Sequence, residues 1–252
     1  MTRFALPALL LLASTACDKG PYRSSPVHRH LAPHRGTEGG FLTYVARHFD
    51  AIYDAEDRRH PVPVRPVLGL PALTRAGGTV QVHYLVRAPV NQARQPIQVA
   101  LVPAGQVCPG PRCHPLALAA ARVRDLGHGV QHVVREATLP AALPRGLYDL
   151  AHRRGAWRHR APAAVDVRAP GAPQQITFVH LTDLHLGAHA TAKLQATLDH
   201  VNRLNPRPDF AVVTGDLVEY GPTRDHWRQV RQSLATLRLP VFVMPGNHDY
   251  YR

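Results

Sequence analysis

The chain has 252 residues, of which 45% are hydrophobic and 19% are charged. This balance is typical of a globular protein with a sizeable core, and the length allows one or two domains. The 30 Lys and Arg residues against 17 Asp and Glu residues give a net charge of +13, but the arginines are scattered and form no stripe of the kind that nucleic-acid binders carry. We therefore expect no nucleic-acid partner, while the charge would favour anionic substrates or membrane surfaces.

The first residues, MTRFALPALLLLASTAC, have the layout of an export signal. Arg3 precedes an apolar stretch, residues 4–13, that is too short to span a bilayer. Residues 1–16 resemble a bacterial lipoprotein signal, which implies that Cys17 is lipidated and becomes the mature N-terminus. Such signals usually carry Leu where this chain has Ser14, so a plain secretory signal is the alternative. We expect a membrane-anchored lipoprotein of the bacterial cell envelope, facing the periplasm or the exterior, or else a secreted protein.

The other two cysteines lie close together in CPGPRC. Cys108 and Cys113 are near enough for a small loop-closing disulfide, which would leave Cys17 as the odd cysteine. A disulfide fits an oxidising compartment. Half a zinc site is the alternative, since His114 adjoins the pair, but the second Cys pair of such a site is missing. We predict the disulfide.

The region before the last third of the chain divides into three parts. Residues 17–40 are rich in Pro, Gly, Ser and charge and should be a flexible tether. Residues 41–61 have apolar side chains at helical spacing and predict a short helical segment. Residues 62–170 contain several short strand-like runs separated by Pro and Gly, which predicts an all-β sandwich domain. The stretch LPAALPRGLYDL resembles the turn and strand near the end of immunoglobulin-like modules.

Residues 174–252 change to an α/β pattern. The apolar runs ITFVHLT, DFAVVTGD and PVFVMPGNHDY predict three strands, and the segments between them have apolar side chains at helical spacing. Strands that alternate with amphipathic helices form a parallel sheet with right-handed crossovers. Ligands bind such sheets outside the carboxyl ends of the strands.

All three predicted strands end in polar side chains of the kinds that bind metals, within TDLHLG, TGDLVE and PGNHDY. An Asp and a His two residues apart on an extended segment point to the same side, and neighbouring parallel strands bring their ends to one edge. Three loops that supply hard or borderline ligands at one place predict a divalent metal site. The candidate residues are Asp183, His185, Asp216, Asn247, His248 and Asp249.

Together these endings resemble the calcineurin-like metallophosphoesterase family, whose first blocks read D-x-H, G-D-x-x-[DE] and G-N-H-[DE]. The resemblance covers about residues 174–252 and implies two divalent ions, such as Mn, Fe or Zn. It places Asp183 and His185 on the first ion, Asp216 between both ions and Asn247 on the second.

The same resemblance implies roles for the neighbouring residues. His248 would be the catalytic histidine facing the leaving group, Asp249 would orient it, and Glu219 would lie in the loop or behind the ligands rather than on a metal. Purple acid phosphatases carry a D-x-G first block and a Tyr where this chain has Glu219, so that branch is disfavoured. The implied reaction is hydrolysis of a phosphoester, in a small molecule or a lipid, by a hydroxide that the two ions activate.

The family's later blocks, a histidine on a following strand and a G-H-x-H, are missing because the sequence stops at Arg252. The second ion would then keep only Asp216 and Asn247. We therefore expect that the 252-residue chain is an incomplete and inactive form of an envelope-anchored phosphoesterase. The alternative is a non-catalytic lipoprotein that binds through its β-sandwich and carries a relict phosphoesterase domain.

Overall fold

The computed structural model describes residues 46–47, 61–87, 97–106, 108, 110–154, 156–171, 175–187, 191–221 and 223–250. The expected signal with Cys17, the tether and nearly all of the short helical segment lie outside these residues; Ala46 and Arg47 are helical. Within the described part of the chain, no helix is both long and apolar enough to cross a membrane.

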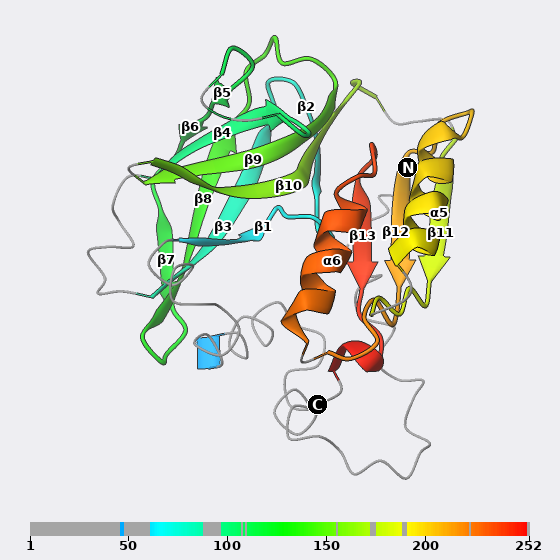
Figure 1. Ribbon diagram of the computed structural model, residues 1–252. Helices are drawn as coiled ribbons and strands as arrows, with labels where there is room; N and C mark the ends of the chain where they lie inside the picture. The colour runs from blue at the N-terminus through cyan, green and yellow to red at the C-terminus, as the bar shows by residue number, and fades with distance from the viewer. Residues whose placement is uncertain are drawn as a thin grey trace, which may run out of the picture.

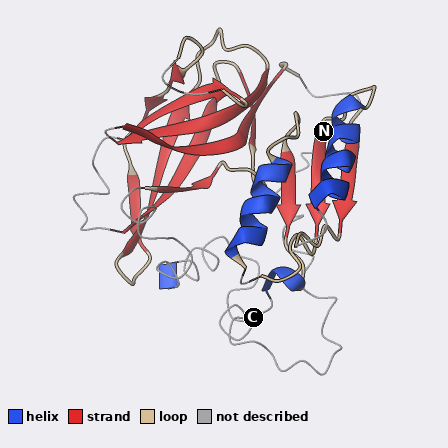
Figure 2. Cartoon of the chain, in the orientation of Figure 1, coloured by secondary structure: helices blue, strands red, loops and turns tan. Residues whose placement is uncertain are grey.

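Residues 62–168 form two sheets that face each other (Figures 1 and 2). The strands of the first sheet, in spatial order, are β1 (Val62–Arg65), β3 (Thr79–Arg87), β8 (Val130–Thr138) and β6 (Ala117–Leu118), and β7 (Arg122–Asp125) also pairs with β8. The strands of the second sheet are β2 (Ala72–Arg75), β10 (Ala156–Arg168), β9 (Gly146–Arg154), β4 (Gln98–Pro103) and β5 (His114–Pro115). The β2–β10 pair is parallel and the other pairs are antiparallel.

One hydrophobic core fills the space between these sheets. Alternate residues of β3, among them Val82 and Tyr84, meet Leu101 of β4 and Leu150 of β9, and all four side chains are fully buried. Every second residue of β3 therefore faces this core, while Leu85 on the other face of the strand is buried in a second cluster with Val62 and Val130. We call this two-sheet region the sandwich; its immunoglobulin-like character stays a prediction.

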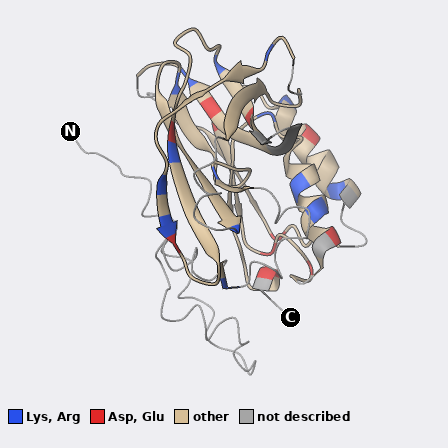
Figure 3. Ribbon diagram, turned by 90° about the vertical axis from the view of Figure 1, so that its left-hand side faces the viewer, with Lys and Arg blue, Asp and Glu red and all other residues tan. Residues whose placement is uncertain are grey.

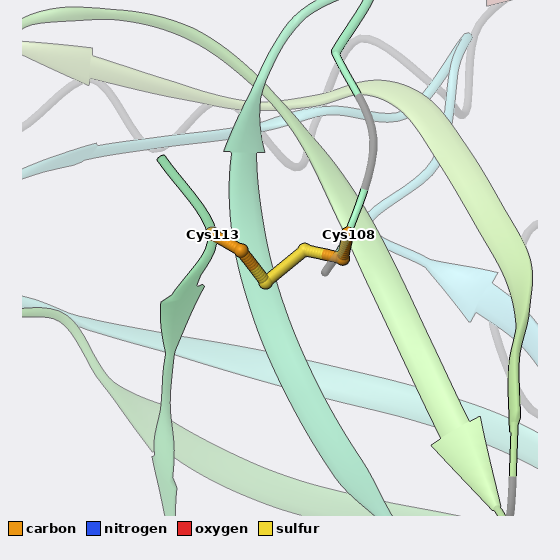
Figure 4. Close-up of a disulfide and its surroundings, with 2 residues drawn as sticks. All are labelled: Cys108 and Cys113. Carbon is orange, nitrogen blue, oxygen red and sulfur yellow. A yellow bond between two sulfur atoms is a disulfide. The ribbon is translucent and has the colours of Figure 1, made fainter. Parts of the chain in front are cut away.

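The loop between β4 and β5 contains a disulfide between Cys108 and Cys113 (Figure 4). Lys and Arg residues are distributed over strands of the sandwich and over both long helices of the following segment (Figure 3). The positive charge is therefore not confined to one element, in keeping with the scattered arginines of the sequence.

Residues 176–250, which we call the α/β segment, form a three-stranded parallel sheet in the order β11–β12–β13. The chain runs through β11 (Phe178–Thr182), α5 (Thr191–Arg203), β12 (Phe210–Thr214), α6 (Arg224–Leu234), β13 (Val241–Met244) and the 3₁₀ turn η4 (His248–Tyr250). This is the alternation of strands and helices that the sequence predicts.

Both helices lie on one face of this sheet (Figure 1). Leu198 of α5 and Leu234 of α6 are buried against Ala211, Val213 and Val241 of the strands. The opposite face carries an aromatic row, in which the ring centroids of Phe178 and Phe210 lie 5.5 Å apart and those of Phe210 and Phe242 lie 5.6 Å apart. Phe178 is 55% exposed there.

The sandwich contacts the α/β segment at the edge of β13. The amide of Val243 donates a hydrogen bond to the carbonyl oxygen of Gly69 (2.9 Å), and Leu68 packs against the core of the α/β segment. Gly69 has φ +92°, and a Cβ atom there would lie 3.2 Å from the Cβ of Val243, so glycine suits this close approach. The strand that leads into GNHD is thus hydrogen-bonded on both edges.

Candidate metal centre

The three parallel strands end at one edge of the sheet. Thr182, Thr214 and Met244 are register partners and are the last residues of β11, β12 and β13. The loops that contain DLH, GDLVE and GNHD therefore start side by side, below the sheet in Figure 1. The register of the three strands therefore brings their ends together, as the sequence predicts.

The backbone conformation of the D-x-H motif differs from the one predicted from the sequence. Because β11 ends at Thr182, neither Asp183 nor His185 is extended; their φ angles are 54° and 43°. The prediction that strand alternation brings Asp183 and His185 to the same side was therefore wrong. An irregular loop brings the two side chains together instead, and backbone hydrogen bonds from His185 N to Asp216 O (2.8 Å) and from Leu186 N to Leu217 O (3.0 Å) hold it against the next loop.

Three of the proposed ligands have positive φ angles, as do His128 and Ala163 in the sandwich. Asp216 also has a positive φ, 45°, and it follows Gly215, whose φ is 75°. Residues other than glycine seldom adopt this left-handed region, although Asp and His tolerate it better than most. Such strain persists only where the surroundings enforce it, and it is frequent at functional sites. Three strained residues at one sheet edge therefore support a functional role for this edge.

Asp183, His185 and Asp216 form a compact cluster of metal-binding side chains. Each offers a ligand atom, and these atoms lie within 4.8 Å of one another. His185 Nε2 is 3.8 Å from Asp183 Oδ1 and 3.8 Å from Asp216 Oδ2. The side chains of Asp183 and His185 are 61% and 32% exposed, so an ion can reach them from solvent. Two carboxylates and an imidazole suit a divalent cation such as Zn²⁺ or Mn²⁺.

His248 lies next to this cluster. Its ring stands nearly perpendicular to that of His185, with the two ring centroids 4.7 Å apart. Its amide donates a hydrogen bond to Asp216 Oδ1 (2.9 Å), and its Nδ1 lies 3.0 Å from the backbone carbonyl oxygen of Glu219. Because a carbonyl oxygen only accepts, Nδ1 carries the proton in this bond.

The contacts of Asp249 give it a structural role, and its expected role in orienting His248 stays a prediction. Its carboxylate accepts hydrogen bonds from the backbone amides of Leu217 (3.2 Å), Val218 (3.0 Å) and Gly246 (2.7 Å). The residue is 8% exposed. Asp249 therefore ties the second loop to the third, and the His248 ring is contacted by the carbonyl oxygen of Glu219.

Gly246 and Asn247 complete the third loop. A Cβ atom at Gly246 would overlap the backbone nitrogen and Oδ1 of Asp216, so this position requires glycine. Asn247 is exposed beside it, and its place on a second ion stays a prediction.

Comparison with known families agrees with this geometry. Residues 176–252 match the model of the calcineurin-like phosphoesterase family. The resemblance seen in DLH, GDLVE and GNHD is thereby confirmed for the α/β segment. The comparisons do not extend this support to a lipoprotein signal or an immunoglobulin-like module.

The relatives that match include proteins named as phosphodiesterases. The chain is 38% identical over 50 residues to a probable glycerophosphodiester phosphodiesterase of Arcobacter nitrofigilis, which covers 20% of this chain and 18% of the relative. It is 39% identical over 82 residues to a probable cyclic nucleotide phosphodiesterase of Rhodopseudomonas palustris, which covers 29% of each chain. A glycerophosphodiester phosphodiesterase of Enterobacter lignolyticus is 35% identical over 82 residues, with the same coverage. The chain spans less than a third of the length of these relatives.

Among solved structures, a purple acid phosphatase of yellow lupin (Lupinus luteus) aligns with 75% of this chain and 36% of its own, at 16% identity and a TM-score of 0.38. That likeness is too weak to bear on the fold.

Glu219 lies behind His185, where the resemblance placed it, and its contacts are more specific than the sequence could indicate. Its carboxylate oxygen Oε2 lies 3.0 Å from His185 Nδ1, and its backbone oxygen holds His248. Its spacing after GD was visible in the sequence, but no spacing rule indicates that one residue contacts both imidazoles. Glu219 is therefore a fifth polar residue at the centre, beside Asp183, His185, Asp216 and His248.

Proposed function

We propose that the protein hydrolyses phosphodiester bonds in a reaction that depends on divalent metal ions. The observation that carries this proposal is the cluster of Asp183, His185 and Asp216, whose ligand atoms lie within 4.8 Å of one another inside the residues that match the phosphoesterase family. Hydrolysis of phosphoesters is the chemistry that such a donor set and such a family share.

The proposed ligands divide between two ions. Asp183, His185 and Asp216 would hold the first ion, and Asp216 and Asn247 would contribute to the second. When bound, such ions make water a stronger nucleophile near neutral pH and stabilise charge on phosphoryl oxygens. The 14% exposure of the Asp216 side chain, against 61% for Asp183, agrees with a central position for Asp216.

His248 supplies the proton in this proposal. Its Nδ1–H is directed at the carbonyl oxygen of Glu219, so a proton exchanged with the departing oxygen would be carried at Nε2. Proton delivery by a positioned side chain contributes about 10²–10⁴-fold to the rate of such reactions. The hydrogen bond from His248 N to Asp216 Oδ1 keeps this ring close to the metal ligands.

The substrate class is proposed from the relatives. Their names specify glycerophosphodiesters and cyclic nucleotides, and both are small phosphodiesters. A chain with a net charge of +13 would also attract an anionic substrate. We therefore propose a small-molecule or lipid-derived phosphodiester rather than a nucleic acid.

The test is hydrolysis of bis-p-nitrophenyl phosphate with added Mn²⁺ or Zn²⁺, with EDTA as the metal-free control. Two proteins should be assayed side by side: the 252-residue chain and the product of the whole open reading frame in the source genome. Metal-dependent hydrolysis by the latter, lost in Asp216→Asn, is the expected result. Metal binding without hydrolysis would contradict the proposal and favour a non-catalytic lipoprotein that binds through the sandwich.

We also propose that Cys17 is lipidated and anchors the protein to a membrane of the cell envelope, because an apolar run and small residues precede it. Expression of the wild type and of Cys17→Ser, followed by fractionation, tests this. The wild type should be found with membranes and the variant in the soluble fraction. Identical soluble distribution of both forms would exclude the anchor.

A further inference from the structure

Glu219 contacts the two histidines of the centre through two different groups. Its side-chain Oε2 lies 3.0 Å from His185 Nδ1, and its backbone oxygen lies 3.0 Å from His248 Nδ1. A carboxylate and a carbonyl oxygen both accept hydrogen bonds, so each Nδ1 must be the donor. One residue thus determines where the proton lies on both rings.

We propose that Glu219 is a positioning residue, whose carboxylate directs Nε2 of His185 at the metal; the contact with His248 Nδ1 is made by its backbone and does not depend on its side chain. The proposal rests on the metal-dependent function proposed above and adds a residue that acts through the ligands. In other metal sites, a carboxylate that accepts the second ring N–H of a ligating histidine fixes its tautomer and orientation and makes it a stronger ligand.

The distances around His185 agree with this role. While Nδ1 contacts Glu219, Nε2 lies 3.8 Å from both Asp183 Oδ1 and Asp216 Oδ2. An imidazole whose Nδ1 bears the proton presents the lone pair of Nε2 on the opposite side of the ring. That lone pair therefore points toward the two carboxylates that complete the proposed donor set.

The backbone of Glu219 is held independently of its side chain. Its amide donates to the carbonyl oxygen of Leu186 (3.1 Å), and Leu186 and Val218 form a parallel bridge between the first and second loops. A Cβ atom at Gly187 would lie 3.2 Å from the Cβ of Glu219, so the two loops touch here. The Glu219 side chain itself is 57% exposed. Its replacement should therefore change the centre without removing buried packing.

A competing arrangement uses the same atoms differently. His185, Glu219 and His248 also offer ligand atoms within 4.8 Å of one another. An ion held there would contact Nδ1 of His185 and would make Glu219 a ligand. The two arrangements differ in which nitrogen of His185 binds the metal, and this can be measured.

The first experiment is ¹⁵N NMR of the 252-residue chain with labelled histidines and bound Zn²⁺. We expect His185 to carry its proton on Nδ1 and the metal on Nε2, and His248 to carry a proton on Nδ1. A metal-bound Nδ1 at His185 would overturn the proposal and make Glu219 a ligand. This result does not depend on any measurement of hydrolysis.

The second experiment is calorimetric titration of Zn²⁺ into Glu219 variants. Glu219→Leu removes the acceptor and should weaken binding about 10–100-fold, while Glu219→Gln keeps a carbonyl oxygen for His185 and should weaken it less. In both variants the Nδ1 proton of His248 should persist, because its acceptor is the backbone. Glu136→Gln removes the same charge from an exposed position of β8 in the sandwich and should leave Zn²⁺ affinity unchanged.

Equal Zn²⁺ affinity in the wild type and Glu219→Leu would contradict the positioning role. Equal losses in Glu219→Gln and Glu219→Leu would contradict the acceptor argument and assign the effect to charge alone. If Glu219→Leu failed to fold, the nitrogen assignments in the wild type and Glu219→Gln would still decide the question. A chain that showed the expected Zn²⁺ site without hydrolysing phosphodiesters would refute the proposed function and leave this positioning role intact.

Discussion

The sandwich and the α/β segment both contain aspartates and histidines, and the two regions place them differently. In the sandwich, Asp149 is 1% exposed and its carboxylate accepts hydrogen bonds from the backbone amides of Gly105 (3.2 Å) and Ala163 (2.8 Å). His152 is also buried, and its Nδ1 lies 3.0 Å from the hydroxyl of Tyr84, whose pKa is raised by burial. These polar groups are paired inside the fold.

In the α/β segment, Asp183, His185 and Asp216 converge at a sheet edge, where solvent reaches them and the backbone is strained. Residue type therefore does not distinguish a site from a core. Convergence of such side chains from separate loops, within reach of solvent, does. Asp249 belongs to the α/β segment but resembles Asp149, since it is buried and bound to backbone amides.

The largest effect on stability is expected for Asp249→Ala. It leaves three backbone amides, those of Leu217, Val218 and Gly246, without their acceptor. At about 1–3 kcal/mol for each buried unsatisfied group, the free energy of unfolding should fall by about 3–9 kcal/mol. Urea denaturation measures this. A loss below about 1 kcal/mol would mean that Asp249 is not the structural residue that its contacts indicate.

A smaller loss is expected for Asp149→Ala, which leaves the two amides of Gly105 and Ala163 without their shared acceptor. The free energy of unfolding should fall by about 2–6 kcal/mol. Zn²⁺ affinity, measured by calorimetry under conditions where the variant is folded, should not change because this carboxylate lies in the sandwich. A loss of Zn²⁺ affinity in Asp149→Ala would contradict the conclusion that the metal site lies in the α/β segment and the sandwich carboxylate is only structural.

The smallest effect is expected for Tyr148→Phe. The Tyr148 hydroxyl donates to the carbonyl oxygen of Pro144 (2.8 Å), a contact of the kind that tyrosine corners make in immunoglobulin-like sandwiches. Burial raises the pKa of this phenol, so it remains a donor at neutral pH. Removing one hydrogen bond should cost about 1 kcal/mol, readable as a shift of the urea midpoint. No shift would mean that the contact does not stabilise the sandwich.

Much of the site could be predicted from the sequence, because apolar runs show where strands end even when the conformation of the following residues is unknown. The apolar runs before Asp183, Asp216 and Asn247 indicated parallel strands, and parallel strands bring their carboxyl ends together. The conformation of Asp183 and His185 could not be predicted from the apolar runs, since it depends on backbone hydrogen bonds to a loop about 30 residues away in sequence.

Two further features of the site could not be predicted from the sequence. The carboxylate of Asp249 binds amides on another loop, and the two oxygens of Glu219 bind two different rings. The contact of Gly69 with β13 joins residues that are more than 170 positions apart. Such contacts leave no periodicity in the sequence, because they depend on how loops and edges meet after folding.

The central claim is that Asp183, His185 and Asp216 form a divalent metal site, and calorimetric titration of Mn²⁺ into the 252-residue chain tests it most directly. Asp225→Asn is the matched control, since Asp225 is 70% exposed on α6 and pairs with Arg228. The account predicts one tight site in the wild type and in Asp225→Asn, and loss of that site in Asp216→Asn with little change in the urea midpoint. Equal Mn²⁺ binding by the wild type and Asp216→Asn, or no binding by either, would contradict it.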